Sequence, residues 1–244
     1  MANLIEAYGK AATSVLTKAP IGDDGTTGSQ RGGTCGLYSL WYATILLGII
    51  DPGDSRQPIY PRKHMNSGGV SSRRYSKSIG SGQGEILNWY EMRSIINNFK
   101  YECDVADAAD ETRRQTFITF CLEKNRPILF AYMEGGNPGK SCHPITAYNA
   151  KYPDGCGSHW ALLIDEVGSN YTFIDPHWPN SLKNASKDTI LKSNAAADEG
   201  PGFSKFEKVF QRSEKSVGNT KTKTYDLGNP QARQSLNNLL VSVY

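Results

Sequence analysis

The chain has 244 residues, of which 27 are Lys or Arg and 24 are Asp or Glu, for a formal net charge of +3. Hydrophobic residues make up 38% of the sequence and charged residues 21%, which is typical of a globular domain with a packed core and excludes a fibrous or disordered chain. The small net charge does not indicate a nucleic-acid partner, and no apolar stretch is long enough for a membrane span, so we expect neither.

The length suits one sizeable domain with a short N-terminal extension. Residues 1–27 are predicted to form an arm or a short amphipathic helix, and residues 28–244 a single domain. The start of the chain lacks the basic segment and continuous apolar block of a Sec-type signal peptide. Residues 52–84 are polar and rich in Ser, Gly, Lys and Arg, which favours a long surface loop.

Hydrophobic periodicity predicts helices first and strands later along the chain. A helix is predicted from Cys35 to about Gly48, because apolar residues recur there at helical spacing and turn-forming residues follow. Two more helices are predicted over 85–99 and 111–125. The predicted strands cover 126–133, 159–167, 170–176, 205–211 and 221–227. This order indicates an α+β fold with a helical side and a sheet side.

One cysteine stands where a helix begins. The five cysteines are odd in number and irregularly spaced, which argues against a disulfide framework and favours a reducing compartment: Cys35, Cys103, Cys121, Cys142 and Cys156. Cys35 alone follows a turn-rich loop and opens a predicted helix, where the helix dipole and unpaired N–H groups favour a thiolate. The neighbouring glycines would let an attacked carbonyl approach closely. Cys35 is therefore a candidate nucleophile.

A candidate base and its orienting group lie in a predicted hairpin, "HWALLIDEVGSNYTFIDP". A five-residue connection over 165–169 would set His159 opposite Asp175, whereas a two-residue turn would send Asp175 to the other face of the sheet. With the first geometry, Asp175 can accept the ring N–H of His159 and fix its tautomer. His159 would then act as general base and acid for Cys35.

Attack of a thiolate on an acyl carbon also requires donors for the oxyanion. The backbone N–H of Cys35 at the helix start can be one donor. The side-chain amide of Gln30, five residues upstream, can be the second.

The segments "TCGLYSL", "GSHW" and "FIDPHWP" together resemble the papain-like cysteine peptidases, most closely the branch that contains the bacteriocin-leader (double-glycine) peptidases. Bacterial effectors of similar pattern in that branch cut or deamidate host proteins. The chain order Cys35, His159, Asp175 matches the papain-like plan. Relatives more often place the oxyanion glutamine six residues before the cysteine, so Gln30 departs from the pattern by one residue.

The resemblance implies a papain-like domain whose catalytic helix packs against an antiparallel sheet. It implies cleavage of a peptide bond in a protein or peptide substrate, a host protein among the candidates, through an acyl-enzyme on Cys35. Deamidation of a glutamine uses the same triad, and a catalytically inactive papain-like binding module is a further alternative. The expected environment is a cytosol, that of a host included if the protein is delivered by a non-Sec route.

Other motifs favour no metal or cofactor. Cys142, His143, Cys156 and His159 lie close in sequence, but adjacent Cys142 and His143 are poorly placed to ligate one ion together. The segment "GGNPGKS" is one residue short of a phosphate-binding loop and precedes no helix. His177 and Trp178 are equally compatible with lining the site and with simple packing.

Overall fold

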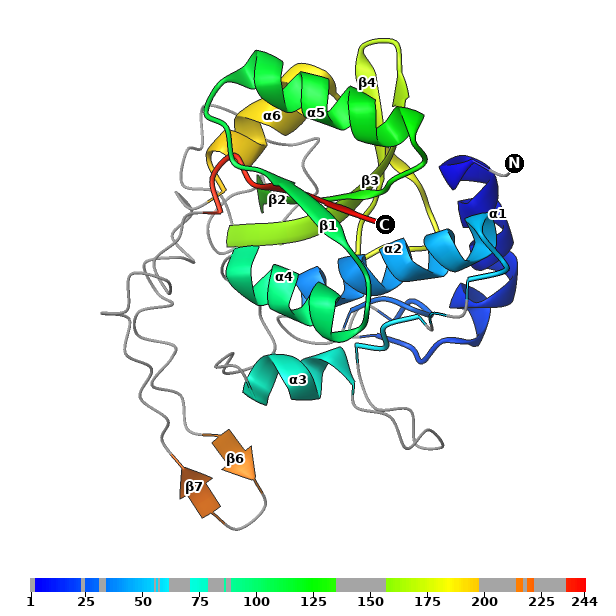
Figure 1. Ribbon diagram of the computed structural model, residues 1–244. Coiled ribbons are helices and arrows are strands. Elements are labelled where there is room, and N and C mark those ends of the chain that lie inside the picture. Colours follow the sequence, from blue (N-terminus) through cyan, green and yellow to red (C-terminus); the bar gives the residue numbers. More distant parts are fainter. Residues whose placement is uncertain are drawn as a thin grey trace.

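The computed structural model has an antiparallel sheet of six strands with helices on both faces (Figure 1). The structure describes residues 3–22, 25–30, 34–54, 56, 58–61, 71–78, 86, 89–134, 157–197, 214–216, 219–221 and 236–244. The predicted α+β class is confirmed. Among the described residues, the longest and most apolar helices still fall short of what a membrane crossing requires.

The sheet has the strand order β1-β8-β2-β3-β4-β5. Its strands are β1 (Cys103–Ala106), β2 (Ile128–Glu134), β3 (Gly157–Val167), β4 (Asn170–Ile174), β5 (Lys183–Ser186) and β8 (Leu240–Val243). The pair β6 (Glu214–Ser216) and β7 (Asn219–Lys221) forms a separate two-stranded sheet. The predicted strands at 126–133, 159–167 and 170–176 are therefore confirmed as β2, β3 and β4. The structure does not describe the predicted strand at 205–211. Of the predicted strand at 221–227, it describes only Lys221, the last residue of β7.

The helices are α1 (Leu4–Ser14), a short 3-10 helix η1 (Leu16–Lys18), α2 (Cys35–Ile50), α3 (Ser72–Ser78), α4 (Trp89–Asn98), α5 (Glu111–Glu123) and α6 (Lys187–Ala195). The helix predicted to begin at Cys35 is confirmed, as are those predicted over 85–99 and 111–125, with slightly shifted ends. The sequence did not predict α6, because the Lys, Asn and Ser residues of this segment leave too few apolar residues for a helical periodicity to be recognised.

The alternation of side chains along each strand makes two cores. One face of β3, with Trp160 and Leu162, packs in the same hydrophobic cluster as α1, α2 and α4. The opposite face, with Ala161 and Leu163, packs with α5 and α6. The sheet therefore lies between two helical layers, and α2 belongs to the first of them (Figure 1).

Helix α2 is buried on all sides in its first three turns. The sequence predicts one apolar face, but every residue from Gly36 to Leu46 is buried. The reason is that α1 packs on α2 in addition to the sheet; Leu4, Ala7 and Tyr8 of α1 are buried in the shared core. The N-terminal segment is thus an integral helix of the fold.

The segment predicted as a long surface loop, 52–84, contains a helix. Ser71 precedes α3, and its Oγ accepts the backbone N–H of Arg74 at 3.3 Å, as at a helix start. Tyr75 of α3 packs edge-to-face on Phe99 and is hydrogen-bonded to Ser94 of α4. The prediction was wrong for residues 72–78, because the polar composition hid a capping serine and one anchoring aromatic residue.

Candidate active site

Cys35 is the first residue of α2 and is half-buried, as a free thiol. The next residue, Gly36, lies so close to β3 that a Cβ there would be 3.2 Å from Cδ1 of Trp160. One turn later, the Ser39 hydroxyl donates to the Trp160 carbonyl at 3.1 Å. The helix start that carries Cys35 is therefore held against the residue that follows His159.

The glycine beside the cysteine has a different role from the one expected. A Cβ at Gly36 would also be 3.2 Å from Cδ1 of Ile86, and Ile86 accepts the indole N–H of Trp160 at 3.0 Å. The protein's own side chains fill the space beside Gly36. Gly36 thus permits close packing of α2 on β3, where the sequence suggested room for a substrate carbonyl.

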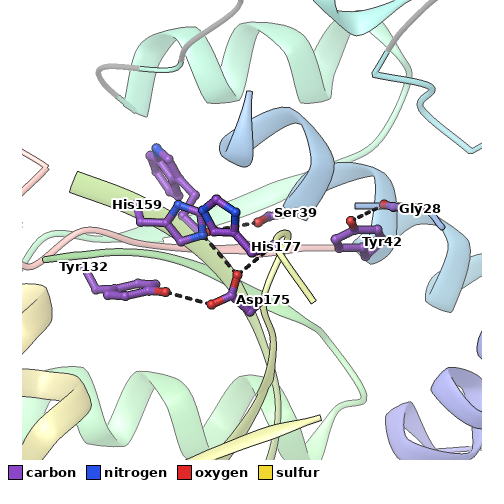
Figure 2. Close-up of polar contacts among 8 residues, drawn as sticks. Gly28, Ser39, Tyr42, Tyr132, His159, Asp175 and His177 are labelled. Carbon is purple, nitrogen blue, oxygen red and sulfur yellow. Dashed lines mark hydrogen bonds and ion pairs between the residues drawn. The ribbon is translucent and has the colours of Figure 1, made fainter. Parts of the chain in front are cut away.

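His159 and Asp175 are in contact. Nε2 of His159 lies 3.3 Å from Oδ1 of Asp175, and the two residues are only 3% and 0% exposed (Figure 2). Because the carboxylate accepts, Nε2 carries the proton and donates, which leaves Nδ1 as the basic nitrogen of the neutral ring.

The hairpin geometry behind this contact differs from the prediction. Val167 pairs with Asn170, so the turn has two residues and not five. A β-bulge at Ile164 then shifts the register, and Leu162 pairs with Ile174. Extending that register by one residue sets Asp175 opposite Ala161, diagonal to His159 on the same face. The predicted pairing of His159 with Asp175 was wrong, but the bulge restores the face that the two-residue turn alone would have reversed.

The Asp175 carboxylate accepts hydrogen bonds from three parts of the chain. Besides His159, the backbone N–H of His177 donates to Oδ1 at 2.8 Å, and the Tyr132 hydroxyl donates to Oδ2 at 3.1 Å. Burial by itself raises the pKa of Asp175, but the charge and hydrogen bond of His159, with the His177 backbone N–H and charge, outweigh burial and lower the pKa to about 2. Asp175 is therefore ionised at neutral pH.

The segment after Asp175 packs on the imidazole. The ring of His177 stacks on that of His159 with centroids 4.8 Å apart and planes 17° from parallel (Figure 2). Trp178 in turn packs on His177, with centroids 5.5 Å apart, and both residues are partly exposed. The side chain of His177 therefore packs on the ring of His159, and that of Trp178 packs on His177.

Gln30 lies beside the same segment. Its backbone N–H donates to the Pro176 carbonyl at 2.8 Å, and the residue is 8% exposed. Hydrogen bonds also hold the preceding residues: the Gly28 carbonyl accepts the Tyr42 hydroxyl at 2.7 Å, and the Thr27 carbonyl accepts the Asn180 side-chain amide at 3.0 Å. Hydrogen bonds therefore join residues 27–30 to the turn that follows Asp175.

The alternative motifs fall largely outside the described residues. Cys142, His143 and Cys156 are not among them, nor is the "GGNPGKS" segment. Within the described ranges, no group of three or more His, Cys, Asp or Glu side chains is close enough to hold a metal ion.

Sequence analysis missed Tyr132. It reads as one more apolar residue of a buried strand, and only the pairing of β2 with β3, which sets Tyr132 directly opposite His159, shows its connection to the site. A pattern confined to one strand carries no such signal.

Comparison of the chain with models of known protein families and with curated proteins gave no match.

Proposed function

We propose that the protein is a papain-like cysteine peptidase that cleaves a peptide bond in a protein substrate. Cys35 is the nucleophile, His159 the general base and acid, and Asp175 the group that orients His159. The observation that carries this proposal is the buried hydrogen bond between His159 Nε2 and an ionised Asp175. Burying an ionised carboxylate costs desolvation free energy, so a fold rarely keeps one without a use. A carboxylate beside an imidazole orients the ring and stabilises its protonated form, as a general base requires.

The reaction follows from the roles of the two ring nitrogens. With Nε2–H donated to Asp175, Nδ1 takes the proton of the Cys35 thiol, and the sulfur attacks the amide carbonyl carbon. Protonated His159, stabilised by Asp175, then gives that proton to the leaving amine as the carbon–nitrogen bond breaks. A water molecule, deprotonated by His159, hydrolyses the thioester and restores the thiol.

The oxyanion of each tetrahedral intermediate needs hydrogen-bond donors beside Cys35. The backbone N–H of Cys35 opens a helix of 16 residues, where N–H groups lack intrahelical partners. The side-chain amide of Gln30 is the second donor, and its backbone bond to Pro176 ties its loop to the Asp175 turn. Since the reaction requires Cys35 as a thiol, we expect it to take place in a reducing, cytosol-like environment.

Thiol reactivity tests the proposed nucleophile. Iodoacetamide should alkylate Cys35 rapidly at neutral pH, and His159→Ala should slow that alkylation. Cys103 and Cys121 are matched comparisons, because burial raises the pKa of both thiols and should keep them slow. Peptide mapping by mass spectrometry gives the rate at each cysteine. Equal rates at Cys35 in the wild-type protein and in His159→Ala would contradict the proposal.

Substrate chemistry is tested by incubating candidate protein mixtures with the wild-type protein and with Cys35→Ala. New peptide termini that depend on Cys35 support the peptidase. A mass gain of about one dalton on glutamine would instead assign the same site to deamidation, where ammonia is the leaving group. A rapidly alkylated Cys35 with neither product would contradict both and favour a binding module.

A further inference from the structure

The two oxygens of Asp175 have different partners. Oδ1 faces His159 Nε2 and the His177 backbone N–H, whereas Oδ2 accepts the Tyr132 hydroxyl from the neighbouring strand (Figure 2). Rotation about the Cβ–Cγ bond of an aspartate is soft, so the donors decide which oxygen faces which partner. A donor on Oδ2 keeps Oδ1 directed at the imidazole.

Tyr132 is itself held firmly. It is fully buried, it pairs directly with His159 in the β2–β3 register, and its ring stacks on Phe130 with centroids 5.3 Å apart. The ring also meets His159 edge-to-face, with centroids 5.4 Å apart and planes at 86°. Tyr132 therefore contacts the imidazole through its ring and the carboxylate through its hydroxyl.

We propose that Tyr132 is a positioning residue of the site, whose hydroxyl fixes Asp175 so that His159 keeps its proton on Nε2 and its basic nitrogen, Nδ1, available for Cys35. Tyr132 acts through Asp175 and His159 and not through contact with a substrate. The consequence for turnover rests on the proposed function, whereas the state of the imidazole can be measured without any substrate.

Tyr132→Phe is the test, since it removes the hydroxyl and keeps the ring. Tyr171→Phe is the matched control: Tyr171 is also fully buried on the same face of the sheet, and its hydroxyl has no hydrogen-bond partner among the described residues. Thermal unfolding followed by circular dichroism checks that both variants fold. Nitrogen-15 NMR of the histidine rings then reports the tautomer of His159.

In Tyr132→Phe, the protected Nε2–H resonance of His159 should weaken or vanish, and kcat should fall about tenfold with KM unchanged, as for loss of a hydrogen bond to a charged group. Tyr171→Phe should retain both properties. If Tyr132→Phe keeps the Nε2–H tautomer and the kcat of the control, the proposal is overturned. A wild-type His159 protonated on Nδ1 would overturn it as well, and this measurement needs no variant.

The two proposals fail in different ways. Unchanged turnover in Cys35→Ala would remove the proposed function and leave the tautomer result standing as a property of the fold. Loss of turnover in Cys35→Ala, together with an unaltered His159 in Tyr132→Phe, would remove only the role of Tyr132.

Discussion

Gly36 lies against the indole of Trp160, with 3.2 Å between the position of a Cβ and Cδ1. This contact joins the helix residue after Cys35 to the strand residue after His159. We expect it to set how closely the start of α2, which carries Cys35, approaches the strand that carries His159.

Gly36→Ala should slow alkylation of Cys35 roughly tenfold, because a shift of a few tenths of an ångström at the helix start is enough to impair proton transfer. Stability should change by less than about 1 kcal/mol, since the better helix propensity of Ala offsets the contact. Gly48→Ala in the same helix is the control, because a Cβ there meets nothing within 4 Å. Identical alkylation rates in the two variants would contradict the prediction.

Asp175→Asn should lower activity by about 10² to 10⁴-fold, because an amide does not stabilise the imidazolium. Its effect on stability should depend on pH. The pKa of Asp175 is lowered from 3.8 to about 2 in the folded protein, so the ionised carboxylate stabilises the fold by about 2 kcal/mol above pH 4 or so. That contribution is lost as the pH falls through 2.

Urea unfolding of the wild-type protein and Asp175→Asn at a series of pH values measures this contribution. The stability difference between them should shrink steadily from about pH 4.5 downward. A difference that stays constant over the acid range would mean that Asp175 has its ordinary pKa in the folded protein.

Gln30→Ala should lower kcat about 10² to 10³-fold, the effect of removing one oxyanion donor. Alkylation of Cys35 should not change, because that reaction forms no oxyanion, and the backbone bond to Pro176 remains. Asn180→Ala is the control, since Asn180 is an exposed residue that holds the same segment through the Thr27 carbonyl. Comparable loss of kcat in both variants would assign Gln30 to loop structure alone.

Tyr8→Phe tests whether α1 supports the site region. The Tyr8 hydroxyl donates to the Pro179 carbonyl at 3.0 Å, so its removal should cost about 1 kcal/mol of stability. Tyr90→Phe, at a position 40% exposed, should cost nothing measurable. Chemical denaturation compares the two, and an equal stability in both would show that the α1 contact with this turn contributes nothing.

Local patterns predicted most of the elements that carry the site. Helical spacing after Cys35 and the two apolar strands around Gly168 are signals within a few consecutive residues, and α2, β3 and β4 form where they indicate. Hydrophobic periodicity does not predict α3 and α6, where polar residues dominate. A cap and one or two buried side chains suffice for a short helix that packs on its neighbours.

The sequence by itself determined that Cys35 begins a helix and that His159 and Asp175 lie near the two ends of a β-hairpin, because the periodicity of hydrophobic residues is encoded locally. Only the tertiary structure decided that Asp175 reaches His159, since a single unpaired residue at Ile164 reverses the face of every residue beyond it. The tertiary structure also decided the roles of Gly36, which packs on Trp160, and of Tyr132, which pairs with His159, because both contacts join elements that are distant in the chain.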